Sequence, residues 1–120
     1  MKIFDLVVSK QNNNKTFYTN VGAGFVKKGK NGSPDYISVK IIPNVVITEA
    51  TLFLCDGAEH QPLGERLNAL VSEQGNDSKT YYHRVGSGFP FSAKDKSGYS
   101  LSLDVALVNG FTLSVPKKQS

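Results

Sequence analysis

The chain has 120 residues, of which 39% are hydrophobic and 20% charged, and its formal charge is +4 with an isoelectric point near 9.2. This composition is typical of one modest globular domain and excludes a disordered chain. The sequence has no run of about 18 apolar residues, which excludes a transmembrane helix. Its N-terminal apolar stretch is short and is interrupted by Asp5, unlike a secretory signal. We therefore expect a soluble, cytoplasmic protein that does not enter a membrane.

The residue types that carry catalysis or bind metals are few and scattered. The single cysteine, Cys55, excludes a disulfide framework and a zinc site built from several thiolates. His60 and His83 have no nucleophile or acid at motif spacing, and the ten acidic residues are dispersed. We expect no metal, no cofactor and no enzymatic activity.

Alternating apolar and polar residues, separated by turn signals, predict strands along the whole chain. Ile37 to Ile41 reads I-S-V-K-I and Leu101 to Val105 reads L-S-L-D-V, which is the period of a strand with one buried face. Turn-forming clusters such as Gln11 to Asn14 and Gly75 to Ser78 separate the strands. The expected strands lie near residues 2–9, 15–27, 35–42, 50–55, 67–73, 79–91, 98–106 and 110–115.

The segment from Leu63 to Glu73 fits two patterns. Its leucines have helical spacing, and good helix formers lie between them. Read through the repeat described next, the same segment is a strand that begins near Leu67. We favour the strand, and leave the helix as the alternative.

The chain contains an internal repeat. Lys15 to Phe25 reads K-T-F-Y-T-N-V-G-A-G-F, and Lys79 to Phe89 reads K-T-Y-Y-H-R-V-G-S-G-F, with seven of eleven residues identical at an offset of 64. The same offset places Leu101 to Val105 over Ile37 to Ile41, and an offset of 61 places Thr112 to Val115 over Thr51 to Leu54. We interpret this as a tandem duplication of a four-stranded meander: a first repeat over residues 1–56, a linker over 57–66 and a second repeat over 67–118.

A sheet of about 55 residues buries little apolar area by itself, so two such sheets gain stability by sharing a core. The sequence predicts an all-β, pseudo-twofold sandwich or barrel of about eight strands that forms one compact domain. The alternative is two small cores side by side.

The V-G-x-G-F segments and the strands that lead into them are the most specific features. Paired glycines inside a strand indicate a bulge, a bend or a close backbone approach, and the functional alternative is a backbone open to a ligand such as a phosphate. Regular alternation places Phe17, Val21 and Phe25 on a candidate core face. It places Tyr18, and Tyr82 in the second repeat, on the opposite, polar face.

Tyrosines on a polar face next to lysine-rich loops are typical of proteins that bind single-stranded nucleic acid, because bases stack on the rings and cations contact phosphates. The structural alternative is tyrosine packed under a loop. The candidate binding residues are Tyr18, Tyr82, Lys15, Lys27, Lys28, Lys79, Arg84, Lys94 and Lys96. We expect single-stranded DNA or RNA as the partner.

Two other functions stay open. A protein-interaction module of a phage or mobile element could inhibit or bridge a host protein, and the aromatics Phe53 and Phe91 could serve such a contact or a homodimer. A small-ligand pocket between the repeats is the third alternative.

The repeated K-T-x-Y-x-x-V-G-x-G-F pattern and the Asn109-Gly110 turn before the last strand resemble a small β-domain of uncharacterised bacterial and mobile-element proteins. The resemblance covers Lys79 to Val115 best and Lys15 to Leu54 more loosely. It implies no activity and assigns no site residue. Its association with mobile elements implies nucleic-acid handling or interference with host defence.

Overall fold

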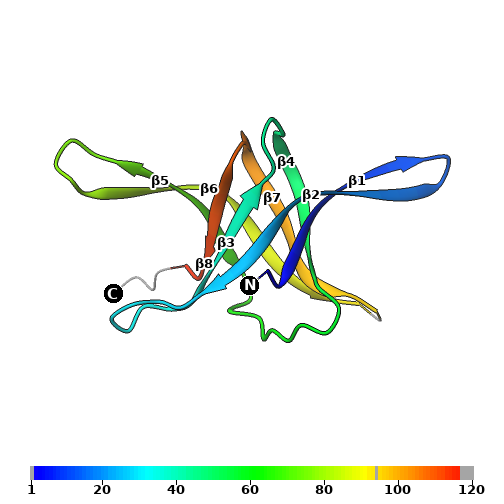
Figure 1. Cartoon of the computed structure of the whole chain (residues 1–120), viewed down its shortest axis with the longest axis horizontal. Coiled ribbons are helices and arrows are strands. Elements are labelled where there is room, and N and C mark those ends of the chain that lie inside the picture. The colour runs from blue at the N-terminus through cyan, green and yellow to red at the C-terminus, as the bar shows by residue number, and fades with distance from the viewer. Residues whose placement is uncertain (1, 94, 117–120) are drawn as a thin grey trace.

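The computed structural model describes residues 2–93 and 95–116, which form eight antiparallel strands. The all-β fold class is confirmed, and Leu63 to Glu73 contains a strand rather than a helix. No helix among the described residues is long and apolar enough to cross a membrane. The strands in chain order are β1 (Phe4–Asn12), β2 (Lys15–Lys27), β3 (Tyr36–Ile41), β4 (Ile47–Leu54), β5 (Leu67–Gln74), β6 (Thr80–Ser92), β7 (Ser97–Leu107) and β8 (Gly110–Ser114) (Figure 1).

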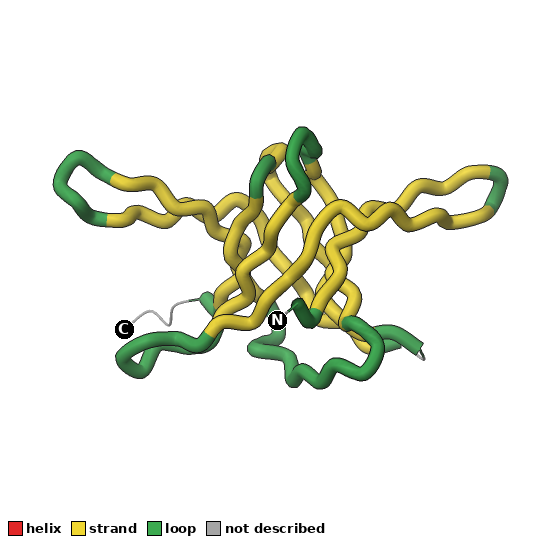
Figure 2. The backbone as a smooth tube through the Cα atoms, viewed as in Figure 1, coloured by secondary structure: helices red, strands yellow, loops and turns green. Residues whose placement is uncertain are grey.

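The strands close into a ring in the order β1-β2-β3-β8-β5-β6-β7-β4, with β4 pairing back to β1 (Figure 2). If β1 to β4 are exchanged with β5 to β8, the order around the ring stays the same. The two halves are therefore arranged alike. Within each half the first three strands form the expected meander. The fourth strand differs, since β4 pairs with β1 and β7 rather than with β3. Each half is thus a Greek key, in the spatial order 4-1-2-3.

Strand pairing shows which residues of the two halves occupy equivalent places. Gly22 and Gly86, 64 positions apart, lie opposite Leu6 and Ala69, which are 63 positions apart. Extending the offset of 64 along the repeat would make Leu70 the equivalent of Leu6, but strand pairing makes it Ala69, one residue earlier. The cause is one extra residue in the β5–β6 hairpin, because Leu6 and Gly22 are 16 positions apart whereas Ala69 and Gly86 are 17 apart.

The equivalence predicted for β3 and β7 is wrong by two residues. Val39 lies opposite Gly24, and Leu101 lies opposite Gly88, so β3 and β7 correspond at an offset of 62. A shift of two keeps every side chain on the same face, which is why the sequence pattern fitted both registers. The structure distinguishes the registers, because Val105 is 50% exposed.

Both V-G-x-G-F segments contain a β-bulge, as the structural interpretation predicted. The β1–β2 ladder steps from Leu6–Gly22 to Val7–Asn20 and skips Val21, and the β5–β6 ladder skips Val85 in the same way. The extra residue reverses the alternation beyond it. The predicted core face is therefore wrong in part: Val21 is buried, Phe25 is half-buried and Phe17 is exposed.

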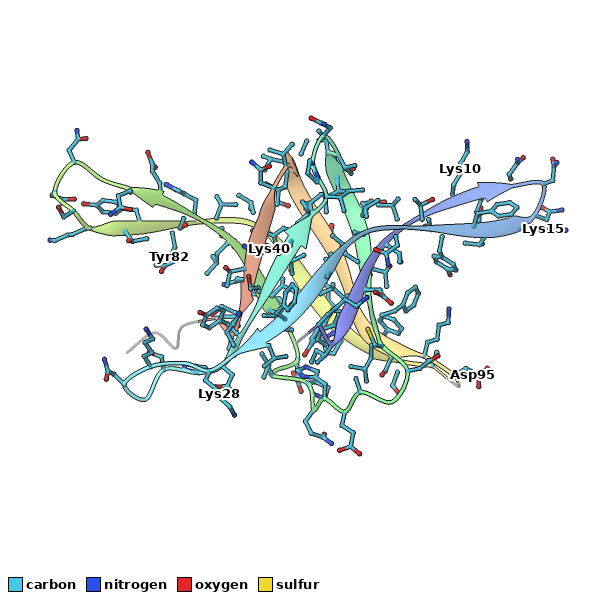
Figure 3. The ribbon with its side chains drawn as sticks, viewed as in Figure 1. Lys10, Lys15, Lys28, Lys40, Tyr82 and Asp95 are labelled. Atoms are coloured by element: carbon cyan, nitrogen blue, oxygen red, sulfur yellow. The ribbon has the colours of Figure 1, made fainter. Side chains whose placement is uncertain are left out.

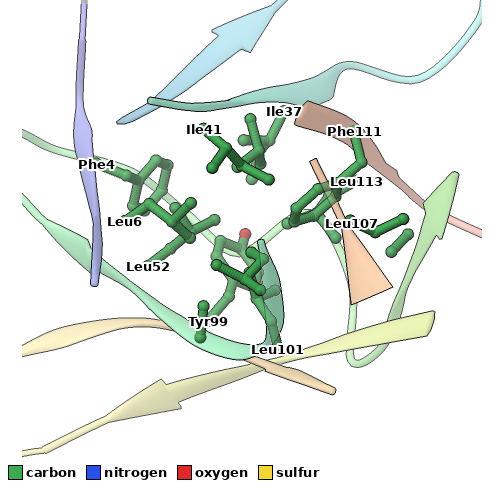
Figure 4. Packing of buried hydrophobic residues seen from close by; sticks show 14 of the residues in the cluster. Phe4, Leu6, Ile37, Ile41, Leu52, Tyr99, Leu101, Leu107, Phe111 and Leu113 are labelled. Carbon is green, nitrogen blue, oxygen red and sulfur yellow. The ribbon is translucent and has the colours of Figure 1, made fainter. Parts of the chain in front are cut away.

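One hydrophobic core fills the ring. Its residues come from both halves, which agrees with a shared core rather than two separate ones (Figure 4). Gly24 makes room for it, because a Cβ there would lie 3.0 Å from the Cβ of Phe4. The largest fully buried side chains are Tyr99, Phe4, Leu6, Ile37, Leu52, Leu67, Leu113 and Val39.

The linker between the halves packs against the core. The ring of His60 lies 5.0 Å from that of Phe4, and its Nε2 lies 2.6 Å from the hydroxyl of the buried Tyr99. The Tyr99 hydroxyl also accepts a hydrogen bond from the backbone N–H of Leu63, at 3.3 Å. A neutral His60 can accept the Tyr99 O–H at Nε2, so this arrangement satisfies the buried hydroxyl.

Gly22→Ala is expected to lower the free energy of unfolding by about 1–3 kcal/mol, because a Cβ at Gly22 would overlap the backbone carbonyl oxygen of Lys40 on β3. Urea denaturation measures the change. Gly64→Ala is the control, since a Cβ there would meet Val115 at 3.4 Å, an ordinary contact. Equal stability of Gly22→Ala and the unmodified protein would contradict this close approach.

Acidification below about pH 6.5 is expected to destabilise the protein through His60. Burial lowers the pKa of His60, so the folded protein binds a proton less readily than the unfolded chain. The free energy of unfolding therefore falls as pH drops from the ordinary histidine pKa toward the lowered one. Thermal melts between pH 7.5 and 5 measure this loss. His60→Gln should reduce the pH dependence, whereas the exposed control His83→Gln should retain it.

Candidate nucleic-acid interface

Two hairpins extend beyond the ring on opposite sides (Figures 1 and 2). The β1–β4 ladder ends at Val7 and the β2–β3 ladder at Gly22, so residues 8–20 form ladder pairs only within the β1–β2 hairpin. We call residues 8–20 the first wing and residues 71–84, which extend in the same way from β5 and β6, the second wing. Most side chains of both wings are exposed.

The turn at each wing tip follows from local sequence. Asn13 and Asn14 have φ of 52° and 64° and connect the paired residues Asn12 and Lys15, which is the two-residue turn that asparagine favours. The second wing has a longer turn. There the Asp77 carboxylate accepts hydrogen bonds from the Lys79 backbone N–H and the Tyr81 hydroxyl.

Tyr18 lies on the outer face of the first wing, where it is 52% exposed and packs in an aromatic cluster. Its ring is 5.3 Å from that of Phe53 on β4, which is 5.9 Å from that of Phe91 on β6; both pairs are edge-to-face. The Lys96 Nζ lies 4.6 Å from the Phe53 ring centroid and 5.4 Å from that of Tyr18. We call Tyr18, Phe53 and Phe91 the first aromatic cluster. The structure thus brings together two predicted site residues, Tyr18 and Lys96.

Tyr82 lies on the outer face of the second wing, is 64% exposed and borders a groove of about 750 Å³. The groove runs between this wing, strand β8, the β2–β3 connection with Pro34, and the start of β3 with Tyr36. We call it the second-wing groove. Because the wings are on opposite sides of the ring, Tyr18 and Tyr82 do not form one continuous surface (Figure 1).

The predicted lysines spread over three regions. Lys15 lies at the tip of the first wing (Figure 3), and Lys79 lies in the turn at the tip of the second wing. Lys27 lies near the end of β2, with its Nζ 5.8 Å from the Phe25 ring centroid. Lys28 is 3.5 Å from the Asp35 carboxylate, so part of its charge is compensated. Lys94 lies outside the described residues.

Arg84 is held on the surface of the sheet by protein groups. Its guanidinium forms an ion pair with Asp104 at 3.1 Å and donates to Asn68 at 3.4 Å and to Ser87 at 2.5 Å. These contacts occupy Nε and both terminal nitrogens. Arg84 is therefore a weaker candidate for phosphate contact than the tip lysines.

Sequence analysis did not assign Phe53, Phe91 or Tyr36 to the nucleic-acid site. Phe53 is recognisable only by comparing the repeats, because its counterpart at the offset of 61 is Ser114. Phe91 follows the V-G-S-G-F segment and joins Phe53 only through the pairing of β6, β7 and β4. Such long-range pairing has no local sequence signal.

The titratable groups of the described residues show little that indicates catalysis. Burial raises the pKa of the Cys55 thiol, which disfavours the nucleophilic thiolate. The hydrogen bond from Lys2 lowers the pKa of Asp5, and the Gly29 backbone N–H lowers that of Asp35. Within residues 2–93 and 95–116, no three His, Cys, Asp or Glu side chains gather as metal ligands.

No family model, curated protein or solved structure matches the chain.

Proposed function

We propose that the protein is a non-enzymatic, cytoplasmic binder of single-stranded DNA or RNA. The observation that supports this most strongly is the exposure of Tyr18 and Tyr82 at equivalent places on the outer faces of the wings. Exposed rings at these positions offer faces and edges on which unpaired bases can stack.

The distribution of cations supports the same function. Lys15 and Lys79 place positive charge at both wing tips, and Lys96 lies beside the first aromatic cluster. A ring with an ammonium group a few ångströms away matches a nucleotide, which combines an aromatic base with a phosphate. The first wing contains Lys10 and Lys15 and no acidic residue, so its formal charge is +2, whereas the two cations of the second wing are balanced by Glu73 and Asp77.

A second candidate function, recognition of a host protein by a phage or mobile-element protein, is favoured by exposed apolar side chains at one end of the ring. Ile42 and Val46 from the β3–β4 connection, and Val105 and Val108 near the β7–β8 turn, are all about half exposed. Apolar groups concentrated at one end favour a protein contact. This candidate predicts no oligonucleotide affinity at physiological salt.

Replacing both wing tyrosines, Tyr18→Ala with Tyr82→Ala, should weaken binding of a labelled oligonucleotide at least 30-fold. The reason is that each stacked base contributes about 1–3 kcal/mol. Fluorescence anisotropy measures the affinity. The matched control, Phe17→Ala with Tyr81→Ala, removes the neighbouring exposed rings on the opposite faces and should keep the affinity. Unchanged affinity of the tyrosine variant would contradict stacking.

Neutralising the wing tips, Lys15→Gln with Lys79→Gln, should reduce the salt dependence of binding. Each phosphate contact contributes about 0.7 to the slope of log affinity against log salt for a single strand, so the slope should fall by about 1.4. Anisotropy titrations at several salt concentrations give the slope. Lys2→Gln is the control, because Lys2 already pairs with Asp5 at 2.8 Å. An unchanged slope in the tip variant would exclude these lysines from the interface.

A further inference from the structure

The two halves differ at one pair of equivalent outer positions. Leu52 on β4 lies opposite Leu6, and Leu113 on β8 lies opposite Ala69, so the next residues, Phe53 and Ser114, are equivalent. Phe53 packs against Tyr18, whereas Ser114 lines the second-wing groove next to Tyr82. The second half therefore lacks the ring that covers the tyrosine in the first.

The same difference between the halves is seen in the burial of β1, which lies beneath Phe53 and Tyr18, and of its equivalent β5. Val7 lies on the outer face of β1 and is only 7% exposed, although it is not part of the core inside the ring. Its equivalent on β5, Leu70, lies opposite Thr112 as Val7 lies opposite Thr51. Leu70 is half-buried and lines the groove. An aromatic ring in the groove would cover Leu70 and Tyr82 together.

The position equivalent to Phe91, another ring of the first aromatic cluster, is occupied by a lysine. Phe91 lies opposite Gly98, and the residue 64 positions earlier on the equivalent strand is Lys27, which lies opposite Tyr36. The side of the ring that carries the second wing thus has an open space at the position equivalent to Phe53, and Lys27 from β2 stands at the position equivalent to Phe91. Figure 3 shows the second wing with Tyr82 above the β2–β3 connection with Lys28.

We infer that the second-wing groove binds one unstacked nucleobase of a single strand, in the place that Phe53 takes against Tyr18, with its phosphate toward Lys27. This inference rests on the proposed function and assigns a base-binding pocket to the second-wing groove, which residues of both halves line. A flat ring matches the apolar and aromatic walls formed by Leu70, Tyr82, Pro34 and Tyr36. In the first half Phe53 fills the equivalent place, so a base can stack there only on the exposed part of Tyr18 and not in a pocket.

Ser114→Phe tests the inference, because it supplies in the second half the ring that Phe53 supplies in the first. The probe is a fluorescein-labelled oligothymidylate of about 12 nucleotides, followed by anisotropy. We expect Ser114→Phe to weaken binding about tenfold or more, since the protein's own ring would occupy the groove. Ser100→Phe makes the same change at an exposed serine on the outer face of β7, away from the groove, and should leave the affinity unchanged.

Tyr36→Ala, on the opposite wall of the groove, is a second variant should Ser114→Phe fail to fold, and it should weaken binding about tenfold. Equal affinities of the unmodified protein, Ser114→Phe and Tyr36→Ala would contradict base binding in the second-wing groove. The proposed function would still stand in that case if the double tyrosine variant lost affinity. An unmodified protein that binds no oligothymidylate and no mixed-sequence oligonucleotide would overturn both, and would favour a protein partner.

Discussion

The pairing of each half with the other is the constraint on which the structure depends. Strands β3 and β4 of the first half find their second neighbours in β8 and β7 of the second half, and these two ladders close the ring. Closure of the ring gives hydrogen-bond partners to the backbone groups that would otherwise lie at sheet edges. It also encloses one apolar core to which both halves contribute side chains. The first half alone would leave β3 and β4 as sheet edges and the side chain of Leu52 uncovered. The second half alone would likewise leave the side chain of Leu113 uncovered.

The wings follow from the same closure. Ring strands β3, β4, β7 and β8 are shorter than the hairpins beside them, so β1–β2 and β5–β6 continue past their neighbours and carry exposed side chains. The bulges at Val21 and Val85 lie where the hairpins leave the ring. They turn the paired glycines toward the core and let the strands beyond present tyrosine outward. The geometry of the core thereby sets which rings are available to a ligand.

Similar halves with different surfaces give the molecule its asymmetry. The first wing is supported by Phe53 and Phe91, while the second wing stands over an open groove between Tyr36 and Tyr82. Arg84, ion-paired to Asp104, is held to the second wing's surface, whereas the lysines at the tips extend into solvent. Equivalent backbones can thus carry unlike functions, because outer side chains are not constrained by the core.

The sequence by itself determined the strand content, because strands depend on local alternation and turn chemistry. The paired glycines indicated a bulge, a bend or a close approach, and alternation placed Tyr18 and Tyr82 on a polar face while it wrongly assigned Phe17 to the core. Tertiary structure alone decided that β4 pairs with β7, that β3 and β7 correspond at an offset of 62, and that Phe53 meets Tyr18 while Ser114 leaves a groove. A shift of two residues preserves every local pattern, and contacts between distant strands leave no local signal. The linker shows the same limit: His60 reads as a polar loop residue, yet the closed ring places it against Phe4 and Tyr99.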